Sequence, residues 1–152
     1  MAIAVGTPAP DFTLEDADKQ PFTLSSFQGS KNVVMLFYPL DWSPTCETEN
    51  CSLAGDFGVV GGPDTEVVGI SRDSTWSHKA WATAKGIKHR LLADVKLEVA
   101  DKYDLRHPAG FISHRATVIV DKAGKVAFVQ VQDKTTEARD MKAVSEALAK
   151  LK

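Results

Sequence analysis

The chain has 152 residues, 43% of them hydrophobic and 25% charged, which is ordinary for a globular protein able to bury a core. A formal net charge of -2 provides no broad basic field, so we expect neither nucleic acid nor an anionic membrane as a partner. No apolar run is long enough to span a bilayer, and the first residues, MAIAVGTPAPDF, lack the basic region of a signal peptide. The sequence therefore predicts one domain, residues 1–152, in the reducing cytoplasm.

The first half of the chain predicts a hairpin followed by alternating strands and a helix. Residues 11–14 and 21–24 flank a polar turn, which favours an N-terminal β-hairpin. Residues 33–38 and 66–70 are apolar runs typical of buried strands, and residues 46–57 between them predict a helix.

The second half first predicts a helix, a short strand and a closing hairpin. Ser74 can cap a helix that ends at Gly86, and residues 91–92 suggest a short strand. Residues 115–120 and 125–131 predict a second hairpin, whose turn is Asp121-Lys-Ala-Gly124.

Two apolar patterns indicate further helices. Val95, Val99 and Tyr103 recur at every fourth position, which is helical spacing. A last apolar stripe predicts a C-terminal helix and consists of Ala138, Met141, Val144, Leu148 and Leu151. We interpret the charges of residues 134–152 as the solvated face of that helix.

Strands alternating with helices predict an α/β protein with a central mixed sheet, compatible with a thioredoxin-like fold.

The two cysteines are informative in a reducing compartment. A structural disulfide is rare there, and two thiols are too few for a typical four-ligand zinc site. The histidines have no metal-binding spacing, so we expect no metal and no cofactor; they are His78, His89, His107 and His114. A buried, inert thiol remains the alternative for each cysteine taken alone.

The segment before Cys46 predicts a reactive thiol. A buried strand ends at Tyr38, and Pro44 suits the entry to the following helix. Cys46 would then lie in the first helical turn, where free backbone N–H groups and the helix dipole favour the thiolate, the reactive form of cysteine.

Three acidic neighbours oppose this thiolate, so a cation must come from elsewhere in the fold. The neighbours are Asp41, Glu47 and Glu49. Arg115, at the start of an apolar strand, is our candidate, because strand ends and helix N-termini of α/β folds meet at one sheet edge. The alternative is that Arg115 solvates the end of its strand.

The residues around Cys46 resemble the active site of the peroxiredoxin family. Pro39, Ser43 and Cys46 match its motif Pro-x-x-x-Thr/Ser-x-x-Cys, and Arg115 matches its active-site arginine. Cys51 resembles the resolving cysteine of the bacterioferritin-comigratory (Q-type) branch. The stretch His78-Lys-Ala-Trp-Ala-Thr is similar to the one-cysteine, AhpE-like branch.

The resemblance implies that the Cys46 thiolate reduces hydrogen peroxide and organic hydroperoxides and becomes a sulfenic acid. Ser43, Arg115 and a backbone N–H of Thr45 or Cys46 would hold the peroxide, and Pro39 would cover the sulfur. Trp42 would rim the site, whereas Trp81, on a predicted helix, is interpreted as a core residue.

The resemblance further implies that Cys51 condenses with the sulfenic acid, and that a thioredoxin-like thiol donor reduces the disulfide of this monomer or weak homodimer. Two other functions stay open: a redox sensor or stress-binding protein, and a one-cysteine peroxidase in which Cys51 is structural. A thiol–disulfide oxidoreductase normally has Cys-x-x-Cys, whereas four residues separate these cysteines.

Overall fold

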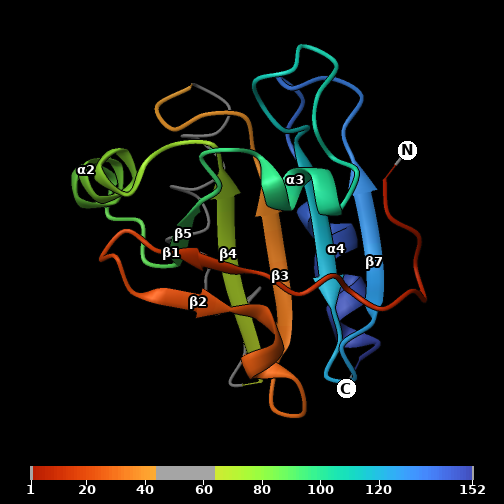
Figure 1. The fold of residues 1–152 in the computed structure, drawn as a ribbon. Helices are drawn as coiled ribbons and strands as arrows, with labels where there is room; N and C mark the ends of the chain where they lie inside the picture. The colour runs from red at the N-terminus through yellow and green to blue at the C-terminus, as the bar shows by residue number, and fades with distance from the viewer. Residues whose placement is uncertain (1, 44–63, 152) are drawn as a thin grey trace.

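A five-stranded sheet forms the centre of the computed structural model, which describes residues 2–43 and 64–151 (Figure 1). Its strands, in the order β5-β4-β3-β6-β7, are β3 (Asn32–Phe37), β4 (Thr65–Ser71), β5 (Arg90–Ala93), β6 (Ala116–Val120) and β7 (Val126–Val131). β3, β4 and β5 are parallel, whereas β6 and β7 are antiparallel to their neighbours. The predicted mixed sheet is confirmed.

Both faces of the sheet are covered, which explains why its central strands lack polar alternation. All six residues of β3 are buried. The hairpin of β1 (Thr13–Glu15) and β2 (Pro21–Thr23), the 3-10 helix η1 (Leu24–Phe27) and α3 (Glu98–Lys102) cover one face. Helix α4 (Met141–Ala149) covers the other, behind the sheet in Figure 1.

Helix α2 (Thr75–Lys85) lies beside β5 and has the predicted caps. The Ser74 hydroxyl accepts a hydrogen bond from the backbone N–H of Ser77 at 3.1 Å, which satisfies a helix-end donor. Gly86 ends the helix with φ 67°, a left-handed conformation that glycine adopts without strain.

The β6–β7 hairpin turns at the predicted residues. The Asp121 carboxylate accepts hydrogen bonds from the backbone N–H groups of Ala123 at 2.9 Å and Lys125 at 3.0 Å. Gly124 has φ 81°, so the turn requires the left-handed region that glycine tolerates.

Two helix starts differ from the prediction. Val95 is 54% exposed, and α3 begins only at Glu98, after Leu97 with φ 58°. α4 begins at Met141 with Asp140 as its N-cap, so Ala138 precedes the helix and is exposed. The interpretation of residues 134–152 as a wholly solvated helix face is wrong, because Arg139 is buried at 7% exposure.

The predicted helix at 46–57 lies outside the described residues. Within 2–43 and 64–151, no helix is long and apolar enough to cross a membrane.

Candidate active site

Three loops meet at one edge of the sheet, the upper edge in Figure 1. The antiparallel register places Ala116, at the start of β6, beside Phe37, at the end of β3, and beside Val131, at the end of β7. The three loops that leave or enter the sheet here are residues 38–43, 105–115 and 132–140. Of the predicted site residues, Pro39, Trp42 and Ser43 follow β3 at this edge and Arg115 precedes β6 at the same edge, whereas Cys46, Thr45 and Cys51 lie outside the described residues.

Arg115 is buried at 1% exposure, so the interpretation that it solvates a strand end is wrong. Its Nε donates a hydrogen bond to the Thr135 carbonyl oxygen at 2.8 Å, and its own carbonyl oxygen accepts one from the Gln132 N–H at 2.9 Å. A guanidinium remains charged at any physiological pH, and burial strengthens its interactions with anions. This edge of the sheet therefore contains a permanent positive charge that is buried away from solvent.

The loop that leads toward Cys46 has a defined conformation as far as Ser43. Pro39 is buried, and the Ser43 hydroxyl donates a hydrogen bond to the Leu40 carbonyl oxygen at 3.1 Å. The oxygen of this hydroxyl can still accept a hydrogen bond from a donor such as the O–H group of a hydroperoxide. Trp42 has φ 69° and is 48% exposed. Its ring centroid lies 6.5 Å from that of Trp81, which is fully buried as predicted for a core residue.

Asp41 is the centre of a buried network that the sequence did not reveal. Its side chain and that of His78 are both 0% exposed. The Asp41 side chain accepts hydrogen bonds from the Tyr38 hydroxyl at 2.6 Å and the Ser77 hydroxyl at 2.9 Å, and it shares a third with His78 Nδ1 at 2.8 Å. The sequence by itself indicates Asp41 only as a charge that opposes the thiolate. Its partner His78 is 37 positions away, so no local pattern could have connected them.

Tyr38 remains a hydrogen-bond donor to this network over a wide pH range. Burial, and then the neighbouring Asp41 carboxylate, raise the pKa of its hydroxyl well above the usual value. The phenol therefore stays protonated and continues to donate to Asp41.

Arg139 is a second buried arginine at this edge, and no sequence pattern indicated it. Its guanidinium donates hydrogen bonds to the Phe37 carbonyl oxygen at 2.7 Å, to Thr117 Oγ1 at 3.1 Å and to the Ala116 carbonyl oxygen. It thus joins the end of β3 to the start of β6. Its position just before the N-cap Asp140 made it resemble a solvated helix charge.

The histidines do not form a metal site in the part of the chain that the structure describes. No group of three or more potential ligands occurs among those residues. The ring centroids of His107 and His114 are 5.0 Å apart. The pKa of His114 is lowered, first by burial and then by the neighbouring His107.

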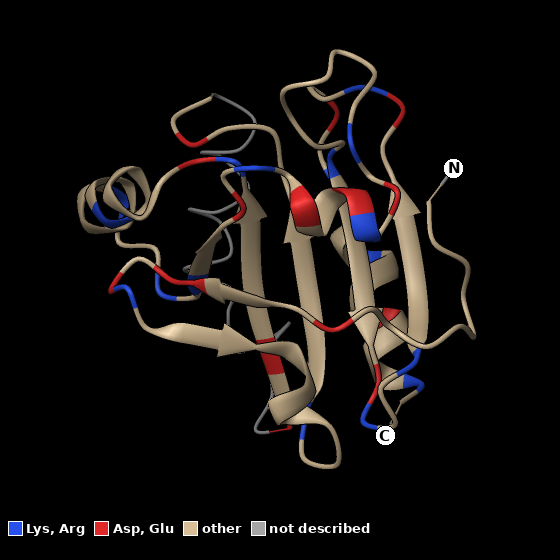
Figure 2. Ribbon diagram, in the orientation of Figure 1, with Lys and Arg blue, Asp and Glu red and all other residues tan. Residues whose placement is uncertain are grey.

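Figure 2 shows acidic and basic residues interspersed along the loops and largely absent from the central strands.

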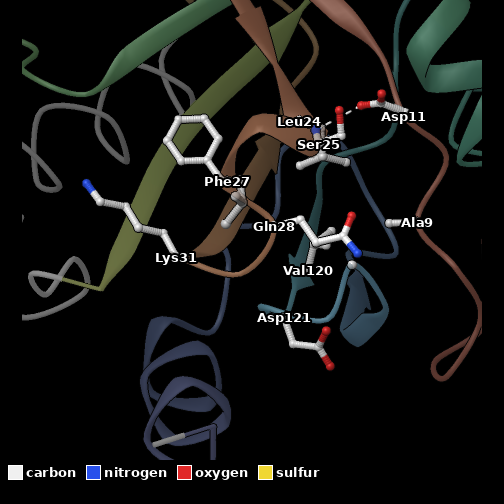
Figure 3. Close-up of a pocket in the computed structure, with 11 residues that line it drawn as sticks. Ala9, Asp11, Leu24, Ser25, Phe27, Gln28, Lys31, Val120 and Asp121 are labelled. Atoms are coloured by element: carbon white, nitrogen blue, oxygen red, sulfur yellow. Dashed lines mark hydrogen bonds between the residues drawn. The ribbon is translucent and has the colours of Figure 1, made fainter.

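The pocket in Figure 3 lies at the opposite edge of the sheet, near the start of β3 and the end of β6. Its polar groups already have partners: the Asp11 carboxylate accepts the Ser25 N–H at 2.9 Å, and the Gln28 amide donates to the Ala123 carbonyl oxygen at 3.3 Å. The pocket is therefore separate from the candidate site.

Comparisons with known proteins agree with this geometry. A model of the AhpC/TSA family matches residues 5–129. Alkyl hydroperoxide reductase E of Mycobacterium tuberculosis is 34% identical over 149 residues, 97% of this chain and 97% of that protein. The chloroplastic peroxiredoxin Q of Sedum lineare is 36% identical over 128 residues, 84% of this chain and 68% of that protein. The reduced 2-Cys peroxiredoxin of Plasmodium vivax, a solved structure, has a TM-score of 0.85 at 30% identity and covers 97% of this chain and 96% of its own.

Proposed function

Because the chain belongs to the AhpC/TSA family of peroxiredoxins and is a thiol-dependent peroxidase, we propose that Cys46 is the thiol that attacks the hydroperoxide. The family match includes Cys46 together with Pro39, Ser43 and Arg115. The observation that carries the proposal is the burial of Arg115 at the sheet edge from which the loop toward Cys46 departs.

The proposed reaction begins with the Cys46 thiolate and a hydroperoxide. The sulfur attacks the terminal oxygen, the S–O bond forms as the O–O bond breaks, and the alkoxide or hydroxide leaves and takes up a proton. Negative charge moves from sulfur to the leaving oxygen. Arg115 stabilises this developing charge, while the Ser43 hydroxyl and a backbone N–H of Thr45 or Cys46 orient the peroxide. Pro39 limits the access of water, and Trp42 borders the entrance.

We propose that Cys51 then resolves the sulfenic acid. Its thiol condenses with Cys46 to form a disulfide and release water, and a thioredoxin-like dithiol reduces the disulfide and is itself oxidised. Hydrogen peroxide and organic hydroperoxides are both substrates in this proposal. The protein works in the cytoplasm as one domain, residues 1–152, either as a monomer or as a weak homodimer.

One stopped-flow experiment tests the proposal. The fully reduced protein is mixed with peroxide, Trp fluorescence is followed, and the product is identified by mass spectrometry. We expect rapid oxidation at Cys46, followed by an intramolecular disulfide and by turnover when thioredoxin and its reductase are added. A stable sulfenic acid that only an external thiol reduces would assign Cys51 a structural role. Rapid oxidation without turnover with any thiol donor would instead support a redox sensor.

A further inference from the structure

The Asp41–His78 pair has a proton count that the geometry fixes. His78 Nδ1 lies 2.8 Å from the Asp41 carboxylate, and His78 Nε2 lies 3.0 Å from the Leu92 carbonyl oxygen. A carbonyl oxygen can only accept, so Nε2 must carry a proton. The contact with the carboxylate needs a second proton, because a bare nitrogen lone pair would repel the carboxylate oxygen.

The two protons make the pair electrically neutral. With both protons on the ring, a histidine cation faces an aspartate anion; with one proton on the carboxyl group, two neutral groups face each other. Either distribution has zero net charge. The pair is fully buried, where an uncompensated charge is costly and acts over a long range.

One member of the pair, Asp41, belongs to the loop that precedes Cys46 in the sequence. Asp41 lies five residues before Cys46 in the sequence, which limits their separation to about 18 Å of extended chain. His78 belongs to α2 and contacts β5 through Leu92. Among the described residues, the other titratable groups that face the pair are Tyr38, just after β3, and Asp73, after β4, which accepts the Asp41 backbone N–H at 2.8 Å.

We propose that His78 is a positioning residue of the peroxidase site that cancels the charge of Asp41, so that the loop before Cys46 presents no buried negative charge to the thiolate. This inference rests on the proposed role of Cys46. It also accounts for how a thiolate can form despite the aspartate in the loop. Hydrogen bonds from His78 to the loop and to β5 hold Asp41 in place at the same time.

The test separates charge from packing by the use of asparagine. His78→Asn retains a donor toward Asp41 but leaves the pair with one negative charge. The double variant Asp41→Asn/His78→Asn and the single variant Asp41→Asn are both neutral. The readout is the rate of alkylation of Cys46 by iodoacetamide as a function of pH in a Cys51→Ser background, which requires no peroxide, together with the peroxide rate in the unmodified background.

We expect His78→Asn to raise the midpoint of Cys46 alkylation by about one pH unit and to slow the peroxide reaction about tenfold at any pH well below the wild-type midpoint, where the thiolate fraction falls by the same factor. The double variant should return the midpoint to within a few tenths of a unit of the wild-type value, which a purely structural role would not allow. Lys79→Gln is the matched control, because it makes the same charge change at the next residue, where the side chain is 60% exposed. Exposed charges are screened, so its midpoint should not move.

Equal shifts in the single and double variants, or an equally large shift in Lys79→Gln, would overturn this inference alone. If His78→Asn does not fold, Asp41→Asn decides: an unchanged midpoint supports the inference, and a decrease of about one unit overturns it. A Cys46 that reacts with neither iodoacetamide nor peroxide in the wild-type protein would overturn the proposed function and this inference with it.

Discussion

Arg115 and Arg139 place two buried guanidinium groups at the edge of the sheet where β3 ends. The hydrogen bonds of Arg139 go to the β3 and β6 backbone and to Thr117, which indicates a structural role. Arg115 directly precedes β6, and its Nε is fixed by the Thr135 carbonyl oxygen. A guanidinium fixed in this way is already oriented before an anion forms, so it loses little entropy on stabilising one.

At Arg115 we predict a requirement for the guanidinium group as well as for its charge. Arg115→Lys keeps a cation but loses the planar fork, so the peroxide rate should fall about tenfold or more. Arg115→Ala should reduce the rate further and raise the pKa of the Cys46 thiol. Stopped-flow rates and the pH dependence of alkylation measure both effects. Wild-type rates with an unshifted thiol pKa in Arg115→Ala would show that Arg115 has only a structural role.

At Arg139 we predict a loss of stability. Arg139→Met has a similar volume but leaves the carbonyl oxygens of Phe37 and Ala116 without this donor, so the free energy of unfolding should fall by about 3 kcal/mol. Urea unfolding measures this change. Lys142→Met, at an exposed position of α4, is the control and should stay within about 0.5 kcal/mol of the wild type. If the free energy of unfolding of Arg139→Met also stayed within about 0.5 kcal/mol of the wild type, the structural role of Arg139 would be contradicted.

At the scale of single elements, local signals predicted helix α2 and the β6–β7 hairpin correctly. Ser74, Gly86 and Gly124 act through their own backbone neighbours, so the sequence contains all the necessary information. The starts of α3 and α4 were predicted too early. Val95 and Ala138 fit a helical period, but the chain is not helical there, and both side chains are exposed. An apolar residue at the correct spacing therefore does not fix where a helix begins.

The helix predicted to contain both cysteines should change if a disulfide forms between them. If residues 46–51 belong to one regular helix, the two Cα atoms are roughly 8.6 Å apart, whereas a disulfide needs about 7 Å or less. We predict that this helix unwinds locally on oxidation. Hydrogen exchange of residues 46–55 should then increase, while β3 stays protected. Trp42 fluorescence should change in parallel. Unchanged exchange in a protein that contains the Cys46–Cys51 disulfide would contradict the predicted helix.

At the scale of the whole molecule, the mixed sheet brings the described residues of the candidate site to one edge from segments far apart in the sequence. The sequence suggested Arg115 because it opens an apolar strand, and the structure adds that an antiparallel β6 brings this start to the end of β3. It could not predict the Asp41–His78 contact or the contacts of Arg139 with β3, which span 37 and 102 positions. Hydrophobic periodicity describes the face of an element, and it contains no information about which polar partner lies across the fold.

Stability of the whole fold should depend on His89 at acidic pH. Burial, and then the charge of Arg139, lower the pKa of His89 from 6.5 to about 4. Between these values the unfolded chain binds a proton that the folded chain does not, so the free energy of unfolding decreases as the pH falls. Urea unfolding at pH 7.5 and 4.5 should show that His89→Gln loses about 2 kcal/mol less over this interval than the wild type. Equal losses would show that His89 does not contribute.

The central claim is that Cys46 is the thiol that reacts with peroxide. The most direct test is the consumption of peroxide by Cys46→Ser and by Cys51→Ser, measured in a single turnover after full reduction. We predict that Cys46→Ser consumes none above the buffer rate. Cys51→Ser should consume about one equivalent at close to the wild-type rate and then stop, because its sulfenic acid has no resolving partner. Substantial consumption by Cys46→Ser, or none by Cys51→Ser, would contradict the assignment of Cys46.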